Sequence, residues 1–315
     1  MKAVVINQYG STEVLQYQDI EQPQIKPNQL LVKVYAASVN PVDWKIRKGL
    51  LKPLTGNKFP MSLGLDVSGE VVAVGDRVTQ FKPGDLIYAD LGYLPGGAYA
   101  EYAAVSEKAA ALKPTNITHE QAAAVPVAGL TALQALRDKG QIKPGYKVLI
   151  NGCSGGVGSF AVQIAKVLGA EVTAVCSTKN IELVKSLGAD RVIDYTQQDF
   201  TQDTVQYDII LDAVGKQSFS RCKNSLTANG VYITTLPTPE SLLQSFLTTF
   251  IPGKKAKFIL ANASGKDLAY LKDWIETGKI LLIIDRTYPL SQVAAAHAHS
   301  ETERAVGKII VTIAS

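Results

Sequence analysis

Cysteine is scarce in this chain of 315 residues, and the first of its three cysteines comes only at Cys153. Together with Cys176 and Cys222 it offers no framework of paired disulfides, the feature that stabilises many small secreted domains. The sequence therefore predicts a protein of a reducing compartment. A chain of this length is long enough to form two ordinary domains.

Charge of one sign and long apolar runs are also missing. The formal net charge is +4, and the longest basic cluster is the short GKKAK at 253–257, which does not favour a nucleic-acid partner. No apolar run approaches the roughly 20 residues of a membrane-spanning helix. The opening MKAVVINQYG enters a strand-like pattern and shows no secretory signal. We therefore expect a globular protein that is cytoplasmic, or soluble within an organelle after processing.

The first third of the chain is rich in β-branched segments that are separated by proline, glycine and asparagine. Strand-like segments are LLVKVYAASVN (30–40), GEVVAVG (69–75), DLIYAD (85–90) and AYAEYAAV (98–105). FKPGD (81–85) and LPGGAY (94–99) are turn sequences. This pattern predicts an antiparallel, barrel-like β domain.

From about residue 119 the pattern changes to helices that alternate with short apolar strands. Thr118 and Gln121 form a capping box for the first helix. The strands KVLING and EVTAVC alternate with helical segments, which is typical of a buried parallel sheet. After about residue 275 short strands return, ending in GKIIVTI, so the C-terminal segment is expected to rejoin the first domain.

A glycine-rich loop, NGCSGGVGSF at 151–160, joins the strand KVLING to the helix that follows. It departs from the pattern G-x-G-x-x-G because Cys153 occupies the first position. Gly155 still lets the backbone approach a pyrophosphate, and Gly158 lets the helix pack closely on the strand. Free N–H groups at the helix start favour an anion. We expect Ser154, Gly155, Gly156, Val157 and Gly158 to bind a dinucleotide; the alternative is a strand–helix turn without a ligand.

The end of the second strand, CSTKN at 176–180, indicates which dinucleotide is bound. NAD-binding proteins often place a carboxylate there for the ribose 2′-hydroxyl. This chain instead has Ser177, Thr178 and Lys179, and hydroxyl and ammonium groups suit a 2′-phosphate. The sequence therefore predicts NADPH, with Ser177 and Lys179 as contacts. The alternative is that these residues only cap the next helix.

These motifs, together with AASVNPVDWKIRKG (36–49), GGAYAEYAAV (96–105), AAAVPVAGLTALQAL (122–136) and LGADRVIDY (187–195), resemble the medium-chain dehydrogenase/reductase superfamily, within it the zinc-independent quinone oxidoreductase and enone reductase branch. The resemblance covers essentially the whole chain. It implies an α/β protein with a GroES-like β-rich catalytic domain and a Rossmann-fold, parallel-sheet nucleotide-binding domain. The implied ranges are 1–120 and 275–315 for the catalytic domain and 121–274 for the Rossmann domain.

The resemblance also implies contacts that the motifs alone do not reveal. Thr131 is similar to a threonine near the nicotinamide, and Tyr195 to a tyrosine beside the 2′-phosphate. Val214, in DAVG, is similar to a residue where the chain passes the cofactor, and Asn40 to one in the substrate cleft. Each has a structural alternative: Asn40 before Pro41 is a natural turn pair, and Val214 suits a buried strand end.

Zinc alcohol dehydrogenases share this architecture, and the ligands they need are largely absent. Asn40 stands where such an enzyme would carry a cysteine, and Gly64-Leu65-Asp66 stands where it would carry Gly-His-Glu. His297 and His299 are two residues apart, so they do not share a helix face. The sequence therefore predicts no metal site.

Without a Lewis acid, reduction of an electron-poor double bond is easier than oxidation of a simple alcohol. We expect hydride transfer from NADPH to a quinone or to the C=C bond of an α,β-unsaturated carbonyl. Donors must meet the charge that develops on the carbonyl oxygen, and Asn40, Lys45 and Tyr93 are the candidates; Lys45 could instead be a solvated charge. The alternative function is an NADPH-binding protein with little turnover, as a redox sensor, RNA binder or structural protein.

The segment ESLLQSFLTTFIPGKKAKFIL at 240–260 places leucine and phenylalanine on one helical stripe, followed by lysines. It could contact a membrane, line a hydrophobic substrate site, or pack on the domain or a dimer interface. The strand GVYITT (230–235) is predicted at the edge of the parallel sheet, where a second subunit could pair with it. A homodimer is therefore a hypothesis.

Overall fold

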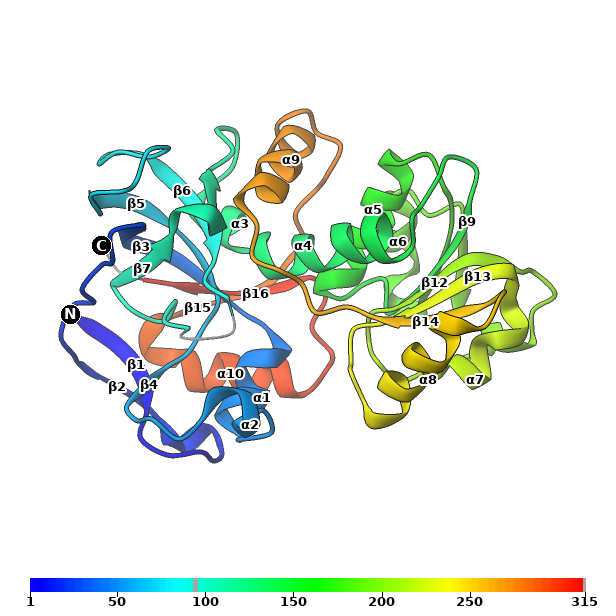
Figure 1. Ribbon diagram of the computed structural model, residues 1–315, viewed down its shortest axis with the longest axis horizontal. Helices are drawn as coiled ribbons and strands as arrows, with labels where there is room; N and C mark the ends of the chain where they lie inside the picture. The colour runs from blue at the N-terminus through cyan, green and yellow to red at the C-terminus, as the bar shows by residue number, and fades with distance from the viewer. Residues whose placement is uncertain (93–95, 314–315) are drawn as a thin grey trace. The chain divides into compact units, whose positions relative to one another are not determined.

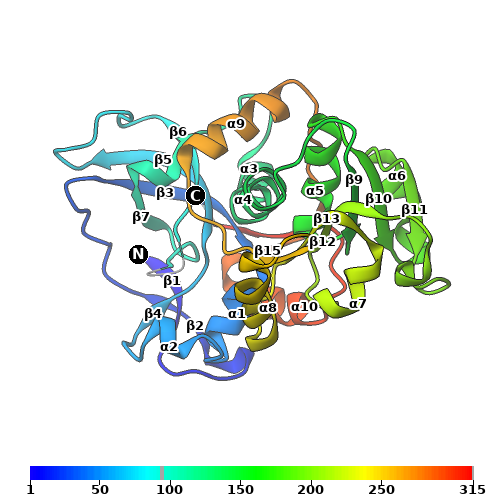
Figure 2. The same cartoon turned by 45° about the vertical axis from the view of Figure 1, so that its right-hand side comes forward.

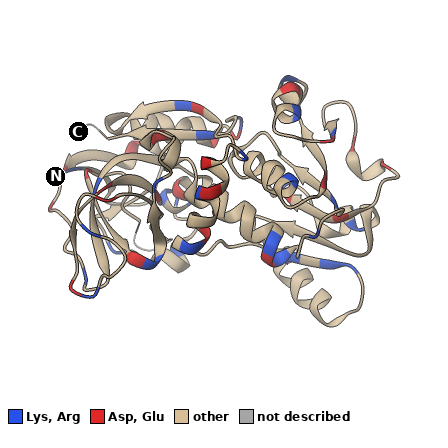
Figure 3. Ribbon diagram, turned by 90° about the horizontal axis from the view of Figure 1, so that it is seen from above, with Lys and Arg blue, Asp and Glu red and all other residues tan. Residues whose placement is uncertain are grey.

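The computed structural model describes residues 1–92 and 96–313. The chain forms two compact units: unit 1 contains residues 1–130, 262–278 and 282–315, and unit 2 contains residues 131–261 and 279–281. The two units are defined by which residues lie close together in space. The functional domain ranges given above stay a prediction. Lysine and arginine are interspersed with aspartate and glutamate over both units (Figure 3).

Unit 1 is built around a sheet with the order β15-β16-β3-β5-β6-β8, and β7 also pairs with β3. A smaller sheet has the order β2-β1-β4. The strands are β1 (Lys2–Ile6), β2 (Leu15–Asp19), β3 (Gln29–Val39), β4 (Met61–Ser62), β5 (Asp66–Val74), β6 (Leu86–Asp90), β7 (Tyr102–Ser106), β8 (Ala110–Leu112), β15 (Ile284–Pro289) and β16 (Lys308–Thr312). Strand β16 pairs antiparallel with β3, so the C-terminal segment does complete the β-rich unit.

Helices of unit 1 are α1 (Pro41–Arg47), α2 (Lys52–Thr55), α3 (His119–Ala123), α9 (Gly265–Glu276) and α10 (Val293–Glu301). Helix α1 packs on α10 (Figure 1). The predicted capping box is confirmed at the start of α3, where Thr118 Oγ1 accepts from the Gln121 N–H and Gln121 Oε1 accepts from the Thr118 N–H. Alternating side chains of the strands fill the core, because successive residues of a strand point to opposite faces of the sheet.

Unit 2 is built around a sheet with the order β11-β10-β9-β12-β13-β14, in which all pairings are parallel. Helices α5 and α6 lie on one side of it and α7 and α8 on the other (Figures 1 and 2). The elements are β9 (Lys147–Asn151), α5 (Gly156–Val167), β10 (Glu171–Cys176), α6 (Ile181–Ser186), β11 (Arg191–Asp194), β12 (Tyr207–Asp212), α7 (Phe219–Cys222), β13 (Leu226–Thr234), α8 (Pro239–Phe250) and β14 (Lys255–Phe258). This is the predicted Rossmann-type layer order.

The prediction that GVYITT forms the sheet edge is wrong. Strand β13, which contains it, lies between β12 and β14. The short segment Lys255–Phe258 follows α8 and pairs with β13 as a further parallel strand. Its alternation of lysine and apolar residues covers only four positions, which is too short to predict a strand from the sequence. Helix α4 (Pro126–Gln134) begins in unit 1, and its residues from Thr131 onward belong to unit 2.

Candidate functional site

The turn after β9 explains why cysteine is accepted at the first position of the glycine loop. The left-handed backbone conformation, φ +80°, belongs to Gly152 and not to Cys153. The Cys153 side chain is fully buried, and its Sγ donates to the Val175 carbonyl oxygen at 3.0 Å. Backbone N–H groups of Gly152 and Cys153 donate to the same carbonyl. The residue therefore faces β10, away from the open side of the loop, where a side chain does no harm.

The outer side of the loop is bare at Gly155. A Cβ atom built there would meet one described atom within 4 Å, the Gly152 carbonyl oxygen at 3.5 Å. Gly155 is the N-cap of α5, and the first N–H groups of a helix have no carbonyl partner within it. These features fit a pyrophosphate that approaches the backbone at the positive end of the helix.

Gly158 serves packing instead. A Cβ atom there would lie 2.1 Å from the Gly152 carbonyl oxygen and 2.6 Å from the Cys153 Cα. The first turn of α5 therefore crosses the loop too closely for any side chain. Gly158 thus has the packing role that the sequence predicts, and Gly156 and Val157 lie between the two glycines in the loop and first turn.

Asn180 joins the glycine loop to the end of β10. Its Nδ2 donates to Ser154 Oγ at 2.9 Å and to Ser177 Oγ at 3.4 Å. Asn180 is nine-tenths buried, so the bridge is fixed, and it brings together two residues that the sequence predicts as cofactor contacts. Asn180 is not among the residues predicted from the sequence; its place in CSTKN was the available signal.

The expected 2′-phosphate site contains one exposed ammonium group. Lys179 is exposed in the short 3-10 helix Thr178–Asn180, and no described group pairs with its Nζ. Tyr195 is 62% exposed at the end of β11, where its N–H donates to the Cys176 carbonyl oxygen. Ser177, Lys179 and Tyr195 therefore gather at the adjacent ends of β10 and β11.

A carboxylate also lies at this end of the sheet. Asp194, which is level with Cys176 in the strand register, accepts from Thr178 Oγ1 at 2.5 Å and from the Thr196 N–H at 2.9 Å. The Thr178 hydroxyl bond holds the pKa of Asp194 below its usual range. Thr178 is thus committed to Asp194, which leaves Lys179 as the group able to neutralise a phosphate.

Val214 packs directly on the glycine loop. A Cβ atom on Gly152 would lie 2.1 Å from Val214 Cγ2. The buried carboxylate of Asp212 fixes this turn, because its Oδ1 accepts from Asn151 Nδ2 at 2.9 Å and from the Gly215 N–H at 3.0 Å. Val214 therefore lies beside the glycine loop and is 41% exposed; its contact with a cofactor stays a prediction. Thr131 is buried in α4.

Asn40, in unit 1, belongs to a buried polar cluster. Its Nδ2 donates to Asp66 Oδ2 at 2.8 Å, and its Oδ1 accepts from Lys308 Nζ at 2.5 Å. Lys308 Nζ also lies 3.2 Å from Asp66 Oδ2. The positions where a zinc dehydrogenase would carry a cysteine and a glutamate therefore hold an amide and a carboxylate, with an ammonium between them. Within residues 1–92 and 96–313, no three His, Cys, Asp or Glu side chains gather as a metal site would require.

Lys45, another predicted catalytic residue, is not part of this cluster. Lys45 Nζ lies over the Trp44 ring, 5.4 Å from its centroid, and partial burial lowers the pKa of Lys45. This geometry is a cation–π contact of the kind that desolvation strengthens. Tyr93 lies outside the described residues.

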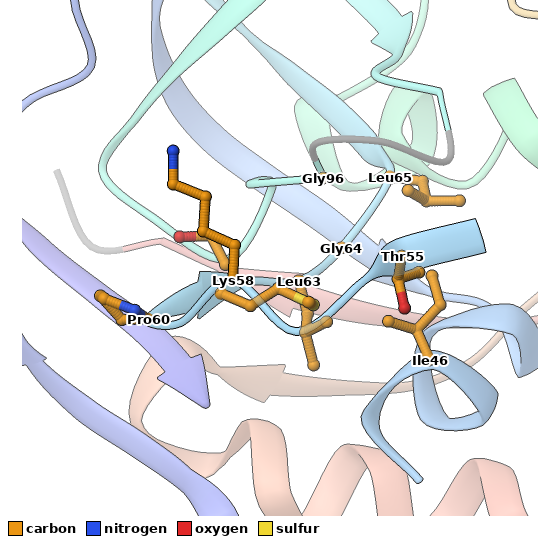
Figure 4. A pocket seen from close by; sticks show the side chains of 10 residues that line it. Ile46, Thr55, Lys58, Pro60, Leu63, Gly64, Leu65 and Gly96 are labelled. Atoms are coloured by element: carbon orange, nitrogen blue, oxygen red, sulfur yellow. The ribbon is translucent and has the colours of Figure 1, made fainter. Parts of the chain in front are cut away.

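A cavity of about 500 Å³ opens in unit 1 (Figure 4). Apolar groups form much of its wall, and Thr55 and Lys58 add polar atoms; the lining residues are Ile46, Thr55, Lys58, Pro60, Met61, Ser62, Leu63, Gly64, Leu65 and Gly96. A wall of this composition suits a small, mostly apolar molecule. The sequence pattern did not reveal it, because its residues come from α1, α2 and the loops around β4.

Comparison with known proteins agrees with the geometry of both units. The family model described as alcohol dehydrogenase GroES-like domain matches residues 26–115, and the model described as zinc-binding dehydrogenase matches residues 187–311. The structure of the quinone oxidoreductase from Coxiella burnetii superposes with a TM-score of 0.91 at 33% identity, over 100% of this chain and 99% of that one.

Two plant proteins are similar along the whole chain. The chloroplast envelope quinone oxidoreductase homolog of Arabidopsis thaliana is 39% identical over 99% of this chain and 98% of its own length. The NADPH-dependent alkenal/one oxidoreductase of the same plant is 39% identical over 99% of this chain and 79% of its own length. The chain belongs to the zinc-independent quinone oxidoreductase and enone reductase branch of the medium-chain dehydrogenase/reductase superfamily.

Proposed function

We propose that this protein is an NADPH-dependent oxidoreductase that reduces quinones or the C=C bond of α,β-unsaturated carbonyls. The glycine loop of unit 2, open at Gly155 and flanked by Lys179, is the observation that carries the proposal. The names of the relatives support it: two are called quinone oxidoreductases and one an NADPH-dependent alkenal/one oxidoreductase. These names favour an enzyme over a cofactor-binding protein with little turnover.

Each part of the cofactor site has a distinct task. The first N–H groups of α5, beginning with Gly156, Val157 and Gly158, would hold the pyrophosphate. Lys179, with Ser177 and Tyr195 beside it, would hold the 2′-phosphate, and Val214 and Thr131 would position the rest of the molecule. When bound, NADPH supplies the hydride, and the protein contributes binding and orientation.

The acceptor carbonyl needs hydrogen-bond donors, because negative charge develops on its oxygen during hydride transfer. We assign this task to Asn40, Lys45 and Tyr93. The Asn40 amide has two N–H groups, one of which donates to Asp66. The cavity lined by Ile46, Leu63 and Leu65 would receive the apolar part of the acceptor.

Turnover with defined acceptors tests this function. The protein is mixed with NADPH and, separately, with a set of enones and quinones, and loss of the absorbance of the reduced nicotinamide is followed. We expect NADPH oxidation that depends on both the acceptor and the protein. Tight NADPH binding without acceptor-dependent oxidation would support the low-turnover alternative and reject the enzyme.

Lys179→Ala should weaken NADPH binding and leave NADH binding nearly unchanged. A charge-assisted bond to phosphate contributes about 1.5 kcal/mol or more, so the loss should be roughly tenfold. Lys185→Ala is the matched control, since Lys185 is exposed on the next helix and pairs with Glu182. The test is to measure the dissociation constants of both variants for NADPH and NADH. Equal losses of affinity for the two cofactors would show that Lys179 does not bind the 2′-phosphate.

A homodimer through the face formed by α8 and β14 is part of the proposal. No residue of α8 is buried, and six neighbouring apolar side chains are 45–73% exposed: Leu242, Leu243, Phe246, Leu247, Phe250 and Ile251. Half-exposed side chains of this size present several hundred Å², against about 800 Å² per partner in a standard interface. No described strand pairs with the outer edge of β14. Its lysines do not block that edge, because Lys255 and Lys257 bond to carbonyls of their own chain.

Phe246→Glu combined with Phe250→Glu should convert the dimer to a monomer, because two charges would have to be buried in the contact. NADPH binding should persist. Tyr17→Glu, at an aromatic residue of unit 1 that is 48% exposed, should leave the dimer intact. Sedimentation velocity measures the state; a monomeric wild type that binds anionic vesicles through α8 would show that a membrane covers this face.

The compartment is the remaining part of the proposal. Within the described residues, no helix has the length and apolar character needed to cross a bilayer. The scarcity of cysteine supports a reducing compartment, and we propose the cytoplasm. Several relatives have chloroplastic or mitochondrial names, so fractionation of the source cells tests this assignment. The acceptor would be a small molecule, with no nucleic-acid partner.

A further inference from the structure

Lys308 is a buried cation that the proposed function does not use. Its side chain is 4% exposed, and lysine is rarely buried unless it is paired. The preceding residue fixes its position: Gly307 has φ +80°, and a Cβ atom there would lie 2.2 Å from the Ile283 carbonyl oxygen. The Lys308 N–H donates to that same carbonyl. The backbone at Gly307 and Lys308 therefore has little conformational freedom, and it places the Lys308 ammonium beside Asn40 and Asp66.

Asp66 connects this ammonium to the start of helix α4. The carboxylate is fully buried, and its Oδ1 accepts from the Val127 N–H at 2.7 Å. Its Oδ2 accepts from Ser38 Oγ at 2.5 Å, in addition to Asn40 and Lys308. Val127 is in the first turn of α4, and Thr131 follows one helical turn later. One carboxylate thus holds both Asn40 and the beginning of the helix that carries Thr131.

A second carboxylate lies beside Asp66, so a cation at this place offsets repulsion between two acidic side chains. Asp90 pairs with Asp66 across β5 and β6 and is also buried. Like charges directly opposite each other in a sheet repel. Burial and the neighbouring Asp66 raise the pKa of Asp90 to about 7, and Lys308 opposes this. Lys308 is the one Lys or Arg that, among the described residues, forms an ion pair with Asp66.

We propose that Lys308 is a positioning residue of the reductase: its buried ammonium holds the Asp66 carboxylate, which orients the Asn40 amide and fixes the first turn of α4 beneath Thr131. This inference rests on the proposed function, because Asn40 and Thr131 matter only if acceptor and nicotinamide lie against them. The Asn40 amide is oriented unambiguously, since its oxygen faces an ammonium and its nitrogen a carboxylate.

The kinetic test uses Lys308→Met and Lys308→Arg in the full chain. We expect Lys308→Met to lower kcat for acceptor reduction roughly tenfold or more, because small displacements of positioned groups cost large factors in rate. The NADPH dissociation constant should stay within about threefold, because the phosphate contacts lie in unit 2. Lys308→Arg keeps the charge and should restore kcat to within about threefold of wild type.

Amide hydrogen exchange gives a readout that does not need activity. In Lys308→Met, residues 127–130 should exchange several-fold faster than in wild type, because the acceptor of the Val127 N–H is no longer held. Glu301→Gln is the control, since it removes the partner of another buried cation of unit 1, Arg47, and should change neither kcat nor exchange in α4. If Lys308→Met does not fold, the double variant with Asp66→Asn, which removes both charges of the buried pair, replaces it.

The outcomes separate the two proposals. If the wild type fails to oxidise NADPH with any of the tested acceptors, the proposed function is rejected. The hydrogen-exchange result would then still show whether Lys308 holds the first turn of α4. Faster exchange with unchanged kcat limits Lys308 to a structural role and overturns the inference. Unchanged exchange, or a Lys308→Arg variant as slow as Lys308→Met, overturns it as well.

Discussion

Gly155→Thr should weaken NADPH binding roughly hundredfold while the protein keeps its fold. The backbone at Gly155 has φ −81° and ψ 178°, an extended conformation that threonine adopts readily, and threonine is about as good an N-cap as glycine. The new Cβ would meet only the Gly152 carbonyl at 3.5 Å among described atoms. It would project into the space that the pyrophosphate needs, and losing two charge-assisted bonds costs about 3 kcal/mol.

Gly158→Ala is the matched comparison, three residues away in the same loop. Its Cβ would overlap the Gly152 carbonyl oxygen, so the fold itself must shift, at a cost of about 1–3 kcal/mol or more. Thermal unfolding and NADPH titration of both variants separate the effects: Gly155→Thr should lose binding and Gly158→Ala stability. Wild-type affinity in Gly155→Thr would place the pyrophosphate elsewhere.

The glycine loop also shows how far the sequence could be interpreted. The order of strand, loop and helix was predicted correctly, because these features are local. The sequence could not show that Gly152 makes the tight turn, because this depends on Val214 packing against it and on the Val175 carbonyl that accepts from Cys153. Those contacts join neighbouring strands whose order in the sheet has no local signal.

The cluster around Asp66 was hidden for the same reason. Asn40 and Lys308 are separated by 268 positions, and each alone has an ordinary explanation, as a turn residue or a surface charge. A lysine that opens the apolar strand IIVTI was the available signal, since a strand buried on both faces leaves a charge little access to water. Strand β14 was missed because lysines alternate with apolar residues over only four positions.

Lowering the pH should change the contributions of Asp43 and His297 to folding stability in opposite directions. Both are buried groups of unit 1. Burial raises the pKa of Asp43 to about 7, and the N–H of Asn40 and the hydroxyl of Tyr99 oppose this. Asp43 Oδ1 is buried without a hydrogen-bond partner, which disfavours the ionised form. An unfolded aspartate has a pKa of about 3.9. The stabilising contribution of Asp43 is therefore complete below about pH 4 and is lost as the pH rises through 7.

Burial, and then Arg47, lower the pKa of His297 to about 3. The geometry gives the reason. The Tyr99 hydroxyl donates to Asp43 Oδ2 at 3.1 Å, so His297 Nε2, 3.3 Å from that hydroxyl, acts as its donor. His297 Nδ1 then accepts from Arg47 Nη1 at 3.4 Å, and a proton on Nδ1 would face the guanidinium. Because an unfolded histidine has a pKa of about 6.5, this contribution is complete above that pH and is lost as the pH falls through 3.

Single substitutions should separate the two contributions. When the pH falls from 7 to 5, the unfolding free energy of His297→Gln should rise by about 2 kcal/mol relative to that of wild type. The reason is that the unfolded variant lacks the imidazole that takes up a proton in unfolded wild type. Over the same fall in pH, the unfolding free energy of Asp43→Asn should drop by about 2–3 kcal/mol relative to that of wild type. The reason is that the folded variant lacks the carboxylate that takes up a proton in folded wild type. Asp90 titrates in the same direction as Asp43 but is present in all three proteins, so it cancels in the differences. Urea unfolding at pH 7 and pH 5 measures the unfolding free energies of the three proteins. If these free energies change with pH in parallel, neither Asp43 nor His297 has the protonation state that its surroundings dictate.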